Sequence, residues 1–159
     1  MSVVEADVLL AEDNPSDAEL ILEALSAVAD VGRVARVHDG VEALDFLLCR
    51  GAQARRAHEP PPRLVLLDIK LPRIEGLEVL AELRREGRTR YVPVVTLTSS
   101  LIESDVRSAY ELGANGYVQK PVDFVRFRDV VQCLGRFWIE MNEPPPAAPQ
   151  RPTTSTSSG

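Results

Sequence analysis

Short aliphatic runs alternate with longer segments of helical periodicity along this chain. The short runs predict buried strands, and they cover residues 7–11, 31–37, 63–67, 92–97 and 116–119. In the segments between and after them, apolar residues recur every three or four positions, as in amphipathic helices. These predicted helices cover residues 15–28, 40–50, 77–85, 103–112 and 123–141. Strands that alternate with helices imply β-α-β units, and therefore an α/β fold with a parallel sheet covered by helices on both faces.

The ends of the predicted elements refine this picture. Asn14 and Asp123 precede two of the helices, where their side chains can accept hydrogen bonds from the first turn. The run at residues 64–67 is apolar on both faces, which suits the centre of a parallel sheet. The last stretch, residues 143–159, is dominated by Pro, Ser, Thr and Ala and cannot bury a core. We therefore expect one domain over residues 1–142, followed by a disordered tail.

Charge and composition restrict the classes of partner. The chain has 159 residues and a net charge of -6. An acidic balance argues against non-specific nucleic-acid binding, which depends on neutralisation of phosphates by Lys and Arg, and against binding to an anionic membrane surface. No apolar run approaches the roughly 20 residues of a membrane helix, and acidic residues stand near the N-terminus where a signal peptide carries Lys or Arg. We expect a cytoplasmic protein with no nucleic-acid and no membrane partner.

Some conspicuous side chains have a structural rather than a chemical interpretation. Residues 51–62 are polar and end in three prolines, so we expect a loop there. Cys49 and Cys133 lie within apolar helical patterns, and we expect both thiols to be buried. The arginines of this loop and of the helix ends, among them Arg56 and Arg84, are expected to be solvated.

The residues that directly follow the strands are the candidates for chemistry, because ligands of open parallel sheets bind outside the carboxyl ends of the strands. Such residues would converge on one edge of the sheet. They are Glu12 and Asp13 after the first strand, Asp68 after the third, Thr98, Ser99 and Ser100 after the fourth, and Lys120 after the fifth.

Each of these side chains has a use in phosphoryl transfer. Three clustered carboxylates repel one another and need a counter-charge, which Mg2+ supplies. Asp68 can then act as the nucleophile and form an aspartyl phosphate. Lys120 and the metal would stabilise the charge of the phosphoryl oxygens, and the Thr98 hydroxyl can donate a hydrogen bond to them. The backbone carbonyl of Lys70 is positioned to complete the metal shell.

The stretches LLAEDNPSD, LVLLDIKLPRIEG, VVTLTSS and GANGYVQKP make the chain similar to the receiver domains of bacterial two-component response regulators, over about residues 6–140. This CheY-like resemblance implies a flavodoxin-like, doubly wound sheet of five parallel strands in the order 2-1-3-4-5. It also implies roles for the residues after the strands. Asp68 would take its phosphoryl group from the phosphohistidine of a sensor histidine kinase, Glu12 and Asp13 would hold Mg2+, Lys120 would contact the phosphate, and Thr98 and Tyr117 would form the switch.

Finer features resemble a subfamily. VHDGVEALDFL, the extended loop before the third strand and the ending RFWIEMNEPP resemble small regulators paired with bacterial phytochromes. Glu12 stands where many receivers carry Asp, so the extra methylene could shift the metal geometry. Lys70 and Ser100 would flank the path of the hydrolytic water and tune the lifetime of the phosphate.

With no output domain expected, the signal must leave through a protein surface. The candidates are the faces of residues 103–112, 116–119 and 123–141, and the last of these predicts a homodimer. Its apolar stripe is wider than the sheet should need. It consists of Phe124, Phe127, Val130, Val131, Leu134, Phe137, Trp138 and Met141.

Two other functions stay open at this point. A phosphohydrolase resembling the haloacid dehalogenase group also forms an aspartyl phosphate, but it needs a second Asp two residues after the nucleophile, and that position is Lys70. We therefore expect a phosphoacceptor switch with at most slow self-dephosphorylation rather than an enzyme. A docking module that works without phosphate is the other alternative, and the complete set of residues after the strands disfavours it.

Overall fold

The computed structural model describes residues 6–28 and 31–146. Its core is one sheet in which every pair of neighbouring strands is parallel, in the order β2-β1-β3-β4-β5. The strands are β1 (Val8–Ala11), β2 (Val34–Val37), β3 (Leu64–Leu67), β4 (Val94–Thr98) and β5 (Gly116–Gln119). The central strand β3 is buried along its whole length. The predicted doubly wound, flavodoxin-like sheet is thus confirmed.

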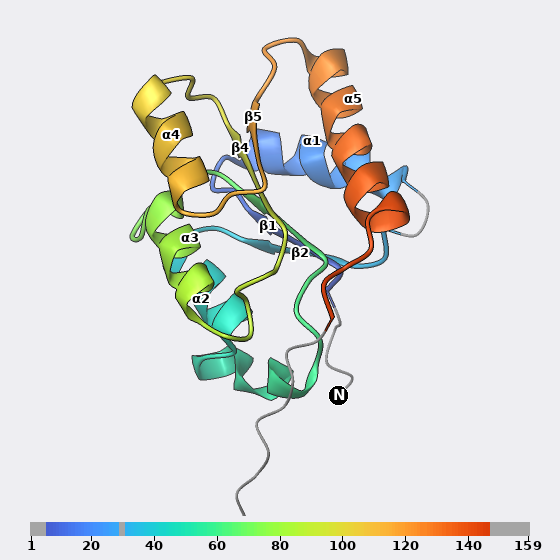
Figure 1. The fold of residues 1–159 in the computed structure, drawn as a ribbon. Coiled ribbons are helices and arrows are strands. Elements are labelled where there is room, and N and C mark those ends of the chain that lie inside the picture. The colour runs from blue at the N-terminus through green and yellow to red at the C-terminus, as the bar shows by residue number, and fades with distance from the viewer. Residues whose placement is uncertain (1–5, 29–30, 147–159) are drawn as a thin grey trace, which may run out of the picture.

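Helices cover both faces of the sheet (Figure 1). They are α1 (Pro15–Ser26), α2 (Gly40–Leu48), α3 (Gly76–Arg85), α4 (Glu103–Glu111) and α5 (Phe124–Gly135). Helices α2, α3 and α4 lie on one side, and α1 and α5 lie on the other.

Successive side chains of a strand pack against the two helix layers in turn, because they point to opposite faces of the sheet. On β1, Leu9 packs with the α2 and α3 side, whereas Leu10 packs with the α1 and α5 side. On β3, Val65 and Leu66 divide in the same way. Each fully buried Leu or Val contributes about 1.5–3 kcal/mol from removal of its apolar surface from water.

Side-chain caps define where the helices begin. Asn14 Oδ1 accepts from the backbone N–H of Asp17 at 3.0 Å, and Asp123 Oδ1 accepts from that of Arg126 at 3.1 Å. Both predicted caps are therefore present. Replacing a capping Asn or Asp by alanine typically costs about 1 kcal/mol.

The segment predicted as a loop over residues 51–62 contains a 3-10 helix, η1 (Gly51–His58), so that prediction is wrong in part. Arg56 is the reason. Its guanidinium lies over the Phe46 ring, 3.4 Å from the ring centroid, and donates to the Phe46 carbonyl. At 3% exposure Arg56 is buried, contrary to the expected solvation, and its side chain fastens the polar segment to α2.

The predicted last helix over residues 123–141 is likewise not one continuous α-helix. It ends at Gly135 and continues as a π-helical segment, η2 (Arg136–Met141), with an N–H of Asn142 donating to the carbonyl of Phe137 at 2.8 Å. Within η2, Ile139 is buried and its carbonyl accepts from Arg63. The wider turn therefore serves the packing of Ile139 into the core.

Three other expectations about side chains are also wrong. Cys49 is half-buried at the end of α2, and Cys133 is exposed on the outer side of α5, so the thiols are not both in the core. Arg84 is half-buried rather than solvated, because its guanidinium donates to the carbonyls of residues 89, 90, 92 and 113 and to Asn115 Oδ1. It thereby ties α3 to the loops that precede β4 and β5.

In the part of the chain that is described, no helix is both long and apolar enough to span a bilayer. Of the predicted tail, residues 147–159 lie outside the described residues, so their disorder stays a prediction.

Candidate functional site

Glu12 and Asp13 directly follow β1, at the carboxyl edge of the sheet. Glu12 is only 1% exposed, whereas Asp13 is exposed. One carboxylate oxygen of Glu12 accepts from the backbone N–H of Asn14 at 3.1 Å, and the other lies 2.8 Å from Lys120 Nζ. Burial, together with the charge of Asp68, raises the pKa of Glu12 from 4.5 to about 7 although Lys120 acts in the opposite direction. Ionisation of the buried Glu12 carboxyl is therefore costly unless a further cation lies beside it.

Asp68 directly follows β3, and both its backbone and its carboxylate are hydrogen-bonded. Its backbone N–H donates to the Ala11 carbonyl at 3.1 Å, which ties it to the end of β1. Its Oδ1 accepts from the N–H of Lys70 at 3.0 Å, and its Oδ2 accepts from Lys120 Nζ at 2.8 Å. Behind it, α3 begins so close that a Cβ on Gly76 would lie 2.2 Å from the Asp68 carbonyl oxygen. The carboxylate is therefore fixed in direction, with only 6% of the residue exposed.

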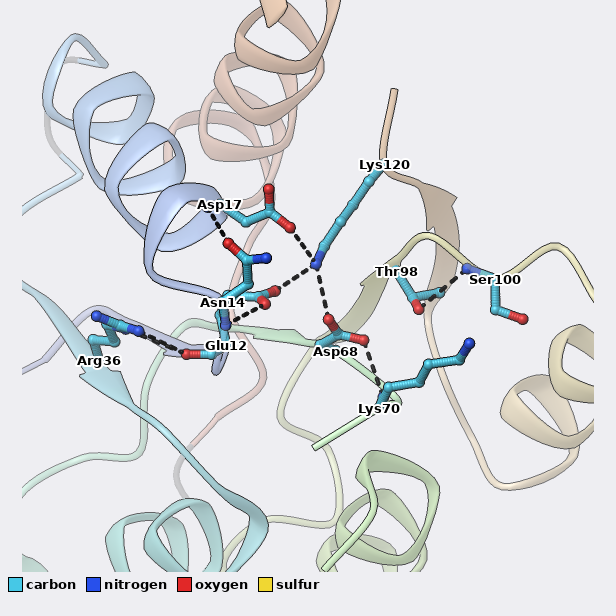
Figure 2. A network of polar contacts seen from close by, with 9 residues as sticks. All are labelled: Glu12, Asn14, Asp17, Arg36, Asp68, Lys70, Thr98, Ser100 and Lys120. Atoms are coloured by element: carbon cyan, nitrogen blue, oxygen red, sulfur yellow. Dashed lines mark hydrogen bonds and ion pairs between the residues drawn. The ribbon is translucent and has the colours of Figure 1, made fainter. Parts of the chain in front are cut away.

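Lys120 follows β5 and reaches across the edge of the sheet (Figure 2). Its N–H donates to the Thr98 carbonyl at 2.8 Å, and its side chain is 10% exposed. The ammonium contacts Glu12 and Asp68 at 2.8 Å and Asp17 at 2.9 Å. Burial alone would lower the pKa of Lys120, but the hydrogen bonds to these carboxylates raise it above its ordinary value. The residue is a permanent cation at physiological pH.

Thr98 ends β4 and is fully buried, and Figure 2 places it on the side of Asp68 away from Glu12. Its hydroxyl oxygen lies 3.4 Å from the N–H of Ser100. Tyr117, on the neighbouring strand β5, donates its hydroxyl proton to the Ser100 carbonyl at 2.8 Å. A chain of contacts therefore runs from Thr98 through the loop after β4 to β5.

The two residues expected to flank a hydrolytic water do not take equivalent positions. The Ser100 hydroxyl donates to Asp105 Oδ2 at 2.7 Å, in the first turn of α4, and Figure 2 shows the side chain pointing away from Asp68. Lys70 is exposed, and only its backbone N–H contacts Asp68. In this arrangement Ser100 serves the start of α4 rather than the site itself.

The predicted metal ligands are brought together. Carboxylate oxygens of Glu12, Asp13 and Asp68 lie within 4.8 Å of one another. Hard divalent cations prefer such oxygen ligands, and their charge would offset the cost of burying the Glu12 carboxylate beside that of Asp68, which raises the pKa of Glu12. The donor set therefore fits a hard divalent cation, and Asp13 is its exposed member.

Asp17 is the member of the site that sequence reasoning missed. It stands in the first turn of α1, where an acidic residue is explained by the helix dipole alone. Its position could have revealed it, because Asp17 comes three residues after Asn14, in the segment that directly follows Glu12 and Asp13. Its contact with Lys120, 103 positions further along the chain, follows only from the folded structure.

Known proteins share the sequence and the fold. A family model described as the response regulator receiver domain matches residues 8–132. FilR2, a probable methanogenesis regulatory protein of Methanothrix harundinacea, is 37% identical over 147 residues, which are 90% of this chain and 92% of that protein. The response regulator Rcp1 of Synechocystis sp. is 36% identical over 133 residues, which are 84% of this chain and 88% of that protein.

Solved structures agree with this match. The crystal structure of the Mn2+-bound form of Rcp1 has a TM-score of 0.81 and 35% identity, covering 87% of this chain and 98% of that chain. The bacteriophytochrome response regulator RtBRR has 46% identity and a TM-score of 0.65, covering 89% of this chain and 84% of that chain.

Proposed function

The chain belongs to the family of response regulator receiver domains, and from that premise we propose that Asp68 is the residue that accepts a phosphoryl group from a sensor histidine kinase. Receiver domains are signalling switches that histidine kinases phosphorylate. The observation that carries the assignment is the contact of 2.8 Å between Lys120 Nζ and Asp68 Oδ2, beside two further carboxylates at the edge of the sheet.

The geometry supports a direct transfer. The Lys70 N–H holds Oδ1 of Asp68, so Oδ2 is the oxygen oriented toward Lys120 and the nucleophile of choice. As the bond from Oδ2 to phosphorus forms, the bond from phosphorus to the kinase histidine nitrogen breaks, and Lys120 stabilises charge on the phosphoryl oxygens. Mg2+, held by Glu12, Asp13 and Asp68, would add positive charge at the same oxygens. Completion of the metal shell by the Lys70 carbonyl is part of this proposal.

The contacts around Thr98 support a route for the signal. A phosphoryl group on Asp68 would offer a charged acceptor to the proton of the Thr98 hydroxyl, whose oxygen now accepts only a long hydrogen bond of 3.4 Å from the N–H of Ser100. The loop after β4 also carries the carbonyl that Tyr117 binds and the hydroxyl that binds Asp105. Movement of Thr98 would therefore reach β5 and the start of α4 together.

The role is that of a switch with at most slow self-dephosphorylation. Rapid hydrolysis would need a side chain that activates water beside the phosphoryl group, and Lys70 stands where a phosphohydrolase would carry its second Asp. An ammonium group cannot serve as that base. A cytoplasmic location and an output to proteins rather than nucleic acid belong to the same proposal, in keeping with the net charge of -6.

The partners are a phytochrome-type sensor kinase and a second copy of the chain. The first is supported by the names of the relatives, since RtBRR is a bacteriophytochrome response regulator. The second is supported by the outer face of α5 and η2. Phe137 is 49% exposed and Met141 is 69% exposed, and Leu134 and Trp138 are half-buried on the same two elements. Light scattering that shows a monomer with and without phosphate would contradict the dimer.

Phosphorylation by a small donor tests the central assignment. Acetyl phosphate with Mg2+ should add one phosphoryl group to the wild-type chain and none to Asp68→Asn. Glu23→Gln, which changes an exposed carboxylate on α1, is the matched control and should be modified like the wild type. A phosphorylated Asp68→Asn protein would refute the assignment.

A further inference from the structure

Lys120 uses all of its donors in the resting site. An ammonium group has three N–H donors, and here Glu12, Asp17 and Asp68 each lie within 2.9 Å of Nζ. A phosphoryl oxygen can therefore become a partner of Lys120 only if one of these contacts is given up. The position of the ammonium during transfer therefore depends on which carboxylate stays bound to Lys120.

Two of the three partners have a competing use. Glu12 and Asp68 belong to the carboxylate group that fits a metal ion, and Asp68 is also the proposed nucleophile. Asp17 is outside the group of carboxylates that fits the metal, because the oxygens that lie within 4.8 Å of one another come from Glu12, Asp13 and Asp68. The contact between Asp17 and Lys120 is thus the one that metal binding and phosphorylation leave available.

Asp17 is also suited to hold a fixed direction. It lies in the first turn of α1, and its N–H donates to the side chain of the N-cap residue Asn14, so the backbone that carries it is held at the start of the helix. Figure 2 shows its carboxylate reaching Lys120 from the α1 side, opposite Asp68. The side chain is 34% exposed, so an ordinary surface ion pair at this place would contribute little to stability.

We propose that Asp17 is a positioning residue that keeps the Lys120 ammonium over the phosphoryl group after the metal and the phosphoryl group have taken over Glu12 and Asp68. The inference rests on the proposed function and deepens it. Asp17 itself touches neither the metal nor the phosphoryl group. It acts by restricting the ammonium to the volume beside Asp68, and loss of such orientation costs rate rather than metal affinity.

The test compares Asp17→Ala, Asp17→Asn and Glu19→Ala in the full chain. Glu19→Ala removes an exposed carboxylate two residues further along α1 and is the matched control for charge. The rate of modification of Asp68 by acetyl phosphate is measured at saturating Mg2+, and Mg2+ affinity is measured separately by calorimetry. Thermal unfolding identifies any variant whose fold has changed.

For Asp17→Ala we expect a rate about tenfold lower with Mg2+ affinity unchanged or higher, because orientation is lost while the metal ligands stay. Asp17→Asn, whose amide oxygen still accepts a hydrogen bond from Lys120, should recover most of the rate, and Glu19→Ala should match the wild type. An Asp17→Ala rate equal to that of the wild type would overturn the inference and leave the proposed function intact. Equal losses in the Asp17→Ala and Glu19→Ala variants, or a loss of Mg2+ affinity that parallels the loss of rate, would also overturn it. No modification of the wild type would instead remove the proposed function on which it rests.

Discussion

Replacing Glu12 by glutamine should remove a pH-dependent destabilisation from the folded chain. Burial raises the pKa of Glu12 to about 7, whereas an unfolded chain leaves it near 4.5. Between these two pH values the folded state holds a proton that the unfolded state has already lost, so the free energy of unfolding falls as pH rises. Below pH 4.5 the carboxyl is protonated in both states, and above about pH 7 it is ionised in both, so the loss is confined to this window.

The shift sets the size of the effect. Each unit of pKa corresponds to about 1.4 kcal/mol, so the metal-free wild type should lose on the order of 3 kcal/mol through Glu12 between pH 4.5 and 7. Glu12→Gln stays neutral over this range and keeps an oxygen that can accept from Lys120. Its free energy of unfolding should therefore fall less than that of the wild type.

Urea unfolding in the presence of a chelator, at intervals from pH 5 to pH 8, measures this difference. Titrating groups that do not interact with Glu12 are common to both proteins and cancel in the comparison. Glu19→Gln, at an exposed position, is the control and should follow the wild-type curve. Parallel curves for the wild type and Glu12→Gln would refute the argument that Glu12 is ionised at a cost in the folded state.

Three further predictions follow from the site and its supports. Mg2+ should bind more tightly at pH 8 than at pH 6, by close to tenfold per unit below pH 7, because a proton competes for the buried carboxylate; calorimetry that shows no pH dependence would contradict this. Arg84→Met should lower the free energy of unfolding by roughly 3 kcal/mol, since several carbonyls lose a charged donor, whereas Arg85→Met, on the exposed side of α3, should cost less than about 0.5 kcal/mol in the same urea titration. Gly76→Ala should cost roughly 1–3 kcal/mol and slow phosphorylation, because the added Cβ would lie against the backbone of Asp68; Gly87→Ala, where a Cβ would meet nothing within 4 Å, should do neither.

Sequence reasoning locates most of the site because parallel strands end at a common edge. A strand that is buried on both faces must change from apolar to polar residues where it leaves the core, so Asp68 is visible as the first charge after four aliphatic residues. The same transition marks Glu12 after β1. These residues are predictable because local pattern and topology together fix their place.

The contacts that the sequence does not reveal are those that side chains make with elements far away in the chain. In the sequence, Asp17 looks like an ordinary acidic residue at the start of a helix. Its partner, Lys120, directly follows β5 and is far away in the chain. Arg56 reads as a solvated charge, yet it is buried against Phe46 because a guanidinium can stack on an aromatic face. Neither outcome follows from periodicity, since each depends on which loops and helices the fold brings alongside.

Borohydride trapping of the phosphorylated chain tests the central claim most directly. Borohydride reduces an acyl phosphate to an alcohol and so converts a phosphorylated aspartate to homoserine, which fragment mass spectrometry locates in the sequence. After treatment with acetyl phosphate and Mg2+, the conversion is expected at position 68, and it should vanish when a chelator removes the metal. Conversion at Glu12, Asp13 or Asp17 in place of position 68, or no conversion at any carboxylate, would contradict the account.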